Sequence, residues 1–164
     1  MLLNLQEFNK SHIPLTFEWV KEKEFQRLFL IRGEVTWEKH FAYFDAILND
    51  SQQRVYAILY DGYHIGNCGF KNIREQDGIG ELWIYIGKDS LRGRGLGTQA
   101  ARLLIQQGFN NLSLNRIYLH VADFNLFARK MYKNLGFIEV TMEEKNEEWD
   151  GRGYEIIHME LNRE

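Results

Sequence analysis

The sequence predicts an α+β domain in which helices flank one sheet. Segments with strand or helix periodicity follow one another in the order β, helices, β-β-β, α, β, α, β-β. The chain has 164 residues, of which 45% are apolar, so it is long enough to bury a core. No repeat, low-complexity tract or Gly/Ser linker interrupts it, and we therefore expect a single domain over residues 1–164.

The N-terminal third is predicted to be one short strand followed by helices. Leu2–Phe8 is short and apolar, which suits a strand, and Pro14 suits the first turn of a helix. Apolar residues in Leu15–Ile31 indicate one or two short helices. A better-defined helix is expected from Thr36, its N-cap, to about Asn49. This region is rich in aromatic residues, some of which we expect to border a pocket: Phe17, Trp19, Phe25, Phe29, Trp37, Phe41, Tyr43 and Phe44.

The middle of the chain changes to strand periodicity. Arg54–Tyr60 and His64–Phe70 read as a hairpin joined by Asp61-Gly62, and Glu81–Ile86 reads as a third strand. A glycine-rich loop follows, and then a helix begins. One face of that helix carries Leu96, Ala100, Leu103, Leu104 and Gly108.

The C-terminal region is predicted to hold three more strands and one helix. Arg116–Val121 is a strand, and Asn125–Asn134 is a helix that ends before a glycine. Phe137–Met142 and Tyr154–Leu161 read as the last two strands, with Asp150-Gly151 in their connection.

Composition excludes several classes of function. The net charge of −3 argues against a nucleic-acid partner, because such proteins usually present a basic face. No run reaches the roughly 18 apolar residues of a membrane helix, and no signal peptide is visible, so we expect no membrane partner and a cytoplasmic location. The five histidines do not fall at ligand spacing, so no metal site is expected. The single Cys68 excludes an internal disulfide and is expected to be buried.

The glycine-rich loop is the most informative segment. It lies between a strand and a helix, where free backbone N–H groups and the helix dipole favour a phosphate. Glycine lets the backbone approach a ligand closely, and Arg92 and Arg94 can add charge-assisted bonds. A P-loop is excluded because Gly-Lys-Ser/Thr is absent. A dinucleotide-binding loop lacks the acidic residue about 20 positions further on. A plain surface turn is the remaining structural alternative.

Two motifs resemble the GNAT family of N-acetyltransferases. Arg92-x-x-Gly95-x-Gly97 is similar to the family's signature of Gln or Arg followed by two spaced small residues. Asn125, Ala128 and Tyr132, followed by Gly136-Phe137, resemble a second family segment. The resemblance is clear over residues 53–161 and weak over the first 50 residues. It implies a GNAT-like fold, with a central, splayed, mostly antiparallel mixed sheet flanked by helices, and a helical substrate lid over about residues 12–50.

The resemblance also implies the cofactor, acetyl-CoA, and where it binds. Backbone amides of Arg94 to Thr98 would hold its pyrophosphate, the strand ending at Ile86 would pair with its pantetheine arm, and an N–H near Ile86 would steady the oxyanion. Asn125 would contact the pantetheine, cap the helix, or do both. The residues expected to bind the cofactor are Ile84, Tyr85, Ile86, Arg92, Gly93, Arg94, Gly95, Leu96, Gly97, Thr98 and Asn125.

The resemblance assigns the two catalytic roles to Tyr132 and Glu81. A phenol of ordinary pKa at Tyr132 would protonate the departing thiolate. Glu81, eleven residues before Arg92, would take a proton from the amine if burial raised its pKa. A core tyrosine and a solvated glutamate are the structural alternatives. Asp123, Tyr85 and His120 are the other candidate bases.

The acceptor is less well defined. The aromatic N-terminal segment and the acidic residues Glu143, Glu144, Glu147, Glu148 and Asp150 favour a small primary amine, such as a nucleotide-linked amino sugar or a polyamine. N-terminal acetylation of a protein, such as a ribosomal protein, and a non-catalytic acetyl-CoA sensor are the alternatives. A homo-oligomer is also possible.

Overall fold

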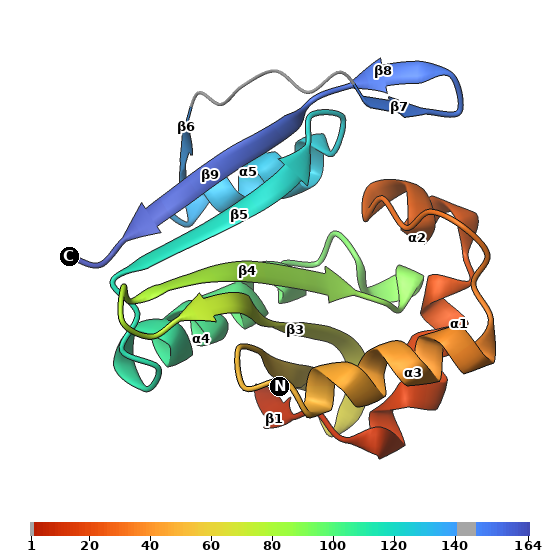
Figure 1. Ribbon diagram of the computed structural model, residues 1–164, viewed down its shortest axis with the longest axis horizontal. Helices are drawn as coiled ribbons and strands as arrows, with labels where there is room; N and C mark the ends of the chain where they lie inside the picture. The colour runs from red at the N-terminus through yellow and green to blue at the C-terminus, as the bar shows by residue number, and fades with distance from the viewer. Residues whose placement is uncertain (1, 141–146) are drawn as a thin grey trace.

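The computed structural model describes residues 2–140 and 147–164, and its main feature is a seven-stranded sheet in the order β1-β2-β3-β4-β5-β9-β6 (Figure 1). Two further strands form a separate hairpin, β7-β8. The elements are β1 (Leu3–Glu7), η1 (Lys10–His12), α1 (Ile13–Val20), α2 (Lys23–Leu28), α3 (Trp37–Leu48), β2 (Arg54–Tyr60), β3 (Tyr63–Arg74), β4 (Ile79–Ile86), η2 (Asp89–Leu91), α4 (Leu96–Asn110), β5 (Arg116–Ala122), α5 (Leu126–Asn134), β6 (Ile138–Val140), β7 (Glu147–Trp149), β8 (Arg152–Tyr154) and β9 (Ile156–Asn162).

The sheet is antiparallel except between β4 and β5, and there it splays. These two parallel strands pair only from Ile79 with Arg116 to Glu81 with Tyr118. Beyond Glu81, β4 continues to Ile86 without β5 as a neighbour, and the strands diverge in Figure 1. The predicted splayed, mostly antiparallel α+β fold is therefore confirmed.

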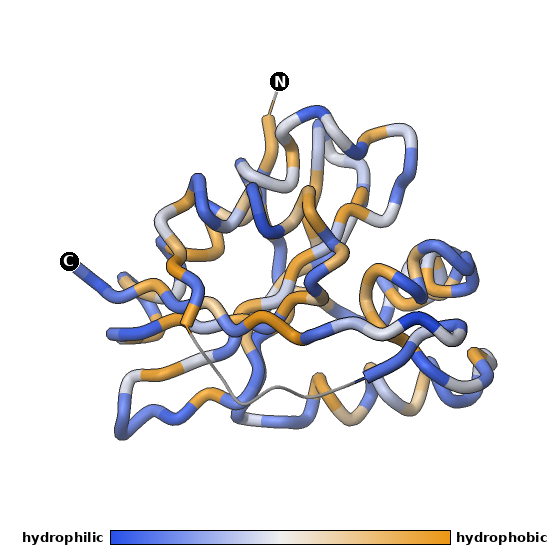
Figure 2. Tube along the Cα trace, turned by 90° about the horizontal axis from the view of Figure 1, so that it is seen from above, coloured by the Kyte–Doolittle hydropathy of each residue, from blue (hydrophilic) through white to orange (hydrophobic). Residues whose placement is uncertain are grey.

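Two layers of helix cover the two faces of the sheet. Successive side chains of β4 point to opposite faces of the sheet. Leu82 and Ile84 join the core formed with α4, while Trp83 and Tyr85 pack toward the N-terminal helices. Along the helices, orange and blue positions alternate in Figure 2, as expected of elements buried on one side. Cys68 is buried in the α4 core, as expected.

The N-terminal elements begin and end as local sequence rules predict. Asn9 caps η1 by accepting a hydrogen bond from the amide of Ser11, and Pro14 lies in the first turn of α1. The Thr36 side chain accepts from the amide of Lys39 and caps α3, which confirms that assignment.

The C-terminal region differs from the sequence-based expectation. The last connection contains the β7-β8 hairpin, with Asp150 and Gly151 at its turn in positive-φ conformations. Its strands are only three residues long, too short for strand periodicity to detect. The strand predicted over Phe137–Met142 corresponds to β6, which spans Ile138–Val140. Residues 141 and 142, like Glu143 and Glu144, lie outside the described residues.

Candidate active site

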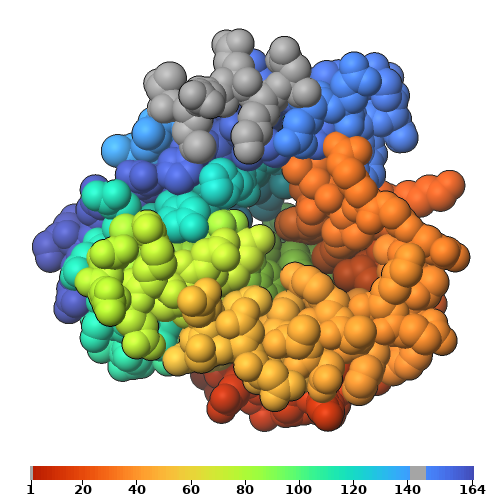
Figure 3. Space-filling view, viewed as in Figure 1, coloured from red at the N-terminus to blue at the C-terminus, as the bar shows by residue number. Residues whose placement is uncertain are grey.

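A cavity of about 1160 Å³ lies where β4 and β5 separate. Its walls are β4, the end of β5, α5, the glycine turn and the N-terminal helices. Figure 3 shows the surface hollowed beside the N-terminal helices, drawn in orange. Pockets for one small ligand usually measure about 300–1,000 Å³, so this cavity is large enough for an extended ligand.

The edge of β4 that borders the cavity has backbone amides that do not pair with β3. The Gly87 amide donates to Ile65 O of the neighbouring β3. Since hydrogen-bonded pairs alternate in an antiparallel ladder, Tyr85 turns its backbone groups toward β3, and Ile84 and Ile86 turn theirs toward the splay. The amides of Ile84 and Ile86 therefore face the cavity, whereas Tyr85 contributes only its side chain.

The glycine turn forms the other wall at this end. Gly93 and Gly95 have φ values of 74° and 78°, a conformation that residues with a Cβ rarely adopt, and Gly95 is the N-cap of α4. Within the described residues, no side chain caps α4, so its first amides are available to an anionic ligand. Gly97 and Thr98 line the cavity at this helix end.

The side chains of Arg92 and Arg94 were both expected to bond to a ligand, and the structure gives them other positions. The Arg92 guanidinium donates to Ile86 O at 2.9 Å and Gly87 O at 3.3 Å, and contacts Asp89 at 3.2 Å, so it ties the turn to the end of β4. Arg94 is exposed and does not line the cavity, and the side chain of Leu96 is buried in the core beneath the turn. The Arg94 side chain is therefore not placed to add a charge-assisted bond in the cavity, while binding of a pyrophosphate by the backbone amides of Arg94 to Thr98 stays a prediction.

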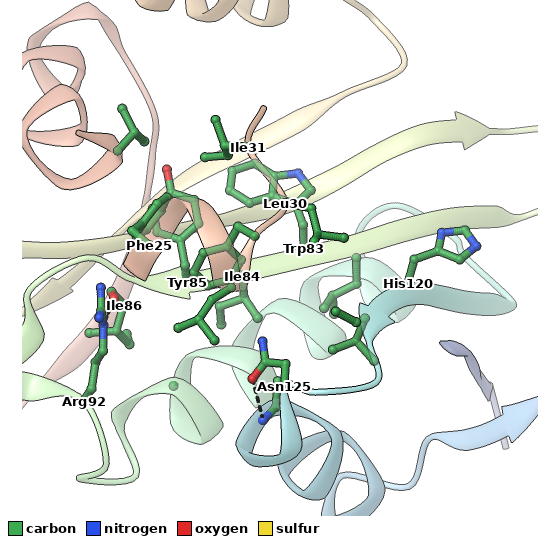
Figure 4. Close-up of a pocket in the computed structure, with 18 of the residues that line it drawn as sticks. Phe25, Leu30, Ile31, Trp83, Ile84, Tyr85, Ile86, Arg92, His120 and Asn125 are labelled. Atoms are coloured by element: carbon green, nitrogen blue, oxygen red, sulfur yellow. Dashed lines mark hydrogen bonds between the residues drawn. The ribbon is translucent and has the colours of Figure 1, made fainter. Parts of the chain in front are cut away.

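The helix α5 brings Asn125 and Tyr132 to the same cavity. Asn125 is the N-cap and accepts from the Ala128 amide at 3.3 Å, the bond drawn as a dashed line in Figure 4. Tyr132 is only 7% exposed, and burial raises its pKa well above the ordinary value. The expectation of an ordinary pKa is thus wrong, and Tyr132 holds its proton at neutral pH.

Glu81 lies at the point where the sheet splays and is 8% exposed. Burial favours the neutral acid, but the His120 ring, the Lys71 ammonium and an amide hydrogen bond from Asn72 outweigh it and lower the pKa to about 2. Its Oε2 lies 3.5 Å from Lys71 Nζ and 3.6 Å from His120 Nδ1, which are ion-pair distances. The predicted rise in pKa is therefore wrong, because these neighbours stabilise the carboxylate.

Of the other candidate bases, only His120 keeps the position that the role requires. The Asp123 carboxylate accepts from the Glu155 amide, and Asp123 does not line the cavity. Burial raises the pKa of the Tyr85 phenol, which also accepts from Asn67. His120 lines the cavity, and Figure 4 places it and Arg92 at opposite ends of the β4 side chains.

Residues of the N-terminal helices and β4 line the rest of the cavity. Of the aromatic residues considered above, Phe25, Phe29, Tyr43 and Phe44 line it, whereas Phe17, Trp19, Trp37 and Phe41 do not. Trp83, Arg32 and Lys71 also line it but were not identified from the sequence. The period-two pattern of β4 could have identified Trp83, because it lies between Glu81 and Tyr85 on the same face.

Arg32 fastens the N-terminal region to the β7-β8 hairpin. Its guanidinium donates to Tyr154 Oη at 2.6 Å and to Glu148 O at 2.7 Å. It also lies 4.8 Å from the centre of the Trp149 ring, a cation–π distance. This contact joins segments about 120 residues apart in the sequence and holds Arg32, which lines the cavity, against the hairpin.

Two features of the described residues concern membranes and metal ions. Residues 2–140 and 147–164 contain no helix that is both long enough and apolar enough to span a membrane. The same residues contain no cluster of three or more His, Cys, Asp or Glu side chains placed to hold a metal ion.

A sheet that opens between two parallel strands, with a glycine turn and a helix N-terminus at its mouth, suits a protein that binds a ligand with a pyrophosphate and an extended arm. The chain belongs to the GNAT family, since the model described as "Acetyltransferase (GNAT) domain" matches residues 3–138. It is therefore an N-acetyltransferase, and the family implies acetyl-CoA as the donor.

Three similar proteins illustrate the range of the family. The human alpha/beta-tubulin-N-acetyltransferase 9 is 25% identical over 150 residues, which cover 83% of this chain and 72% of that protein. The Escherichia coli spermidine N(1)-acetyltransferase is 32% identical over 94 residues, 57% of this chain and only 50% of that enzyme. A Vibrio cholerae spermidine N-acetyltransferase, solved with CoA and spermine, superposes with a TM-score of 0.90 at 19% identity, over 98% of this chain and 95% of that one.

Proposed function

We propose that the protein transfers the acetyl group of acetyl-CoA directly to a primary amine of a small molecule, preferably a nucleotide-linked amino sugar. The observation that carries this proposal is one cavity with two different ends. The cofactor end consists of the glycine turn, the start of α4 and the free edge of β4. The acceptor end consists of the cavity residues of α2, α3 and the loop between them.

The cofactor end fits acetyl-CoA in three respects. The first amides of α4 suit a pyrophosphate, the amides of Ile84 and Ile86 suit the pantetheine amides, and Asn125 lines the same cavity. Bound acetyl-CoA supplies an activated thioester carbonyl to the site.

The residues around the splay suit the transfer. Glu81 remains a carboxylate and attracts the ammonium form of the acceptor. After the amine loses a proton, its nitrogen forms a bond to the acetyl carbon, and the Ile86 amide stabilises the oxyanion. As the C–S bond breaks, Tyr132 protonates the sulfur and regains a proton from the acetylated nitrogen, so that the products are an amide and a free thiol.

The charges of the acceptor end favour an acceptor that carries an anionic group. Among the described lining residues of this end and of β3 and β4, the cations are Arg32, Lys39 and Lys71, and the anions are Glu34 and Glu81. A polyamine would bring several ammonium groups to a lining with more cations than anions. A nucleotide-linked amino sugar carries one amine, a diphosphate that suits the cations, and a base that can stack on the aromatic side chains.

Two further acceptors have support from relatives. The E. coli and V. cholerae relatives named for spermidine make a polyamine the second candidate. The human relative named for tubulin supports a protein acceptor. A non-catalytic acetyl-CoA sensor is disfavoured by the presence of both Tyr132 and the Glu81 cluster in the cavity. A homo-oligomer stays a prediction, which light scattering would test.

A thiol-release assay with acetyl-CoA tests the proposal. The kcat/KM values for a nucleotide-linked amino sugar, spermidine and a short peptide with a free N-terminus would be compared at two salt concentrations. We expect the amino sugar to be preferred, most strongly at low salt. A preference for spermidine would contradict the charge reasoning, and a preference for the peptide would contradict a small-molecule acceptor. Acetyl-CoA binding without any acetylated amine would indicate a sensor.

A further inference from the structure

A row of polar side chains crosses β4, β5 and β9 on the sheet face opposite the α4 core. Glu81 Oε2 lies 3.6 Å from His120 Nδ1, and His120 Nε2 lies 3.1 Å from His158 Nδ1. His158 Nε2 in turn lies 2.9 Å from Glu160 Oε1. The strand register produces the row, because His120 pairs with His158 across β5 and β9.

The far end of the row determines where the protons lie. A carboxylate only accepts hydrogen bonds, so His158 donates to Glu160 through Nε2–H. In neutral His158 the other nitrogen, Nδ1, is then an acceptor, and His120 must donate to it through Nε2–H. Neutral His120 is thereby left with its lone pair on Nδ1, the nitrogen that faces Glu81.

At the end of the row beside the cavity, a proton is needed between two acceptors, His120 Nδ1 and the Glu81 carboxylate. A lone pair on His120 Nδ1 and the Glu81 carboxylate repel each other unless a proton lies between them. Protonation of His120 supplies one, and so does the ammonium group of an acceptor held in the cavity. His120 and Glu81 both line that cavity.

We propose that His120 Nδ1 accepts the proton from the acceptor's ammonium group, and that His158 and Glu160 position His120 for this step by fixing its tautomer. The inference deepens the proposed function and rests on it. The N–H bond of the ammonium breaks, its electron pair stays on nitrogen, and the proton binds Nδ1. The imidazolium is then stabilised by the Glu81 carboxylate and by its hydrogen bond to His158.

The division of roles between Glu81 and His120 follows from their chemistry. Lys71 and the Asn72 amide lower the pKa of Glu81 whichever tautomer His120 adopts, so the Glu81 carboxylate is a weak base toward an alkylammonium ion, and it acts as the fixed negative charge. Imidazoles change protonation near neutral pH and suit the transfer better. The charged and titratable groups that face His120 are Glu81 with Lys71 behind it, Tyr118 on its own strand, and His158 with Glu160 on β9.

The tautomer can be tested without any acceptor. Long-range ¹H–¹⁵N NMR at pH 8.5 should show His120 as the Nε2–H tautomer in the wild type. Glu160→Gln should keep this tautomer, because the amide oxygen still accepts from His158. His158→Phe should lose the preference of His120 for the Nε2–H tautomer. His158→Gln should keep that preference, since the glutamine side-chain oxygen can accept from His120 Nε2–H. An Nδ1–H tautomer in the wild type would overturn the positioning role.

Kinetics test the proton transfer, with the amine that turns over fastest in the panel described above. His120→Gln should lower kcat by roughly 10²-fold near pH 7, remove the acid limb of the kcat/KM profile and leave KM for acetyl-CoA unchanged. His158→Phe should lower kcat by roughly 10-fold with partial rescue in His158→Gln. Glu139→Gln is the matched control, because Glu139 on the adjacent β6 pairs with Arg129 away from the row.

The outcomes separate this inference from the function on which it rests. An unchanged kcat and acid limb in His120→Gln would overturn the inference while acetyl transfer stands. If the wild type acetylates no amine of the panel, the proposed function falls, and the catalytic part of the inference falls with it.

Discussion

The cofactor end and the acceptor end of the cavity are built from different kinds of contact. At the cofactor end, two positive-φ glycines and the uncapped start of α4 lie within a few residues of each other in sequence, and Arg92 bonds to carbonyls six and five residues before it. At the acceptor end, Arg32 bonds to Glu148 and Tyr154, which are 116 and 122 residues away. Local backbone geometry makes the first end, and long-range packing makes the second.

This difference suggests how the two substrates are recognised. Backbone amides can bind a phosphate or an amide group without help from particular side chains, so we expect the proposed cofactor end to tolerate side-chain changes but few backbone changes. The acceptor end consists mostly of side chains from separate segments, so single substitutions can alter its specificity. The four predictions below test this contrast, from the largest expected effect to the smallest.

Gly97→Val should abolish acetyl-CoA binding. A Cβ at Gly97 would meet Met131 Sδ at 3.6 Å and Ile86 Cγ1 at 3.7 Å, so the fold has room for a methyl group while the ligand loses its approach to the helix end. In the wild type, acetyl-CoA at 100 times its Kd should stabilise the protein by about 2.7 kcal/mol, which thermal unfolding would detect. The variant should show no such shift.

Gln99→Val is the control for this prediction. Gln99 is an exposed residue of the same helical turn that does not line the cavity, so the same side chain there should leave the shift intact. A normal shift in folded Gly97→Val would contradict the assignment of the glycine turn.

Tyr132→Phe should reduce kcat by roughly 10²-fold without weakening acetyl-CoA binding, because the ring still fills its buried site and only the proton donor is lost. Steady-state kinetics and the acetyl-CoA thermal shift would be measured together. An unchanged kcat, under conditions where the chemical step limits the rate, would make Tyr132 a structural residue.

Arg32→Ala should affect the acceptor end alone. Loss of the contacts to Tyr154, Glu148 and Trp149 should raise KM for the acceptor by roughly 3- to 10-fold, the range expected for partly exposed charged hydrogen bonds. The acetyl-CoA thermal shift should not change. Lys21→Ala is the control, because it removes an exposed pair with Glu18 and a cation–π contact with Phe17, and neither Lys21 nor Phe17 lines the cavity. A loss of acetyl-CoA binding in Arg32→Ala would show that the two ends are not independent.

Glu81→Gln should change the acid stability of the protein by a small amount. The folded-state pKa of Glu81 is lowered from 4.5 to about 2, so its ionised form stabilises the fold above about pH 4.5. That contribution is lost as the pH falls through about 2. The wild type should therefore be more stable than the variant near pH 6, and the difference should shrink between pH 4.5 and 2 in chemical denaturation. A constant difference over this range would contradict the lowered pKa.

The sequence-based predictions succeeded where neighbouring residues decide the structure. The strand Arg54–Tyr60, the Thr36 cap and the helix after the glycine turn match the structure, because each depends on residues within one or two turns. Asn125 was expected to cap a helix, contact the cofactor or both, and the cap is confirmed. The charge-assisted bond expected from the Arg94 side chain finds no support, because a sequence motif does not show which way each side chain of the turn is directed.

The sequence by itself determined the order of the elements from β1 to α5, the glycine turn before α4 and the family to which the chain belongs. Only the tertiary structure decided the lowered pKa of Glu81, the pairing of His120 with His158 and the contact of Arg32 with the β7-β8 hairpin. Backbone conformation and capping are set by residues close in sequence, so a sequence pattern can reveal them. Ionisation and tautomers depend on charges that the strand register brings together from distant segments, and the register is known only once the sheet is assembled.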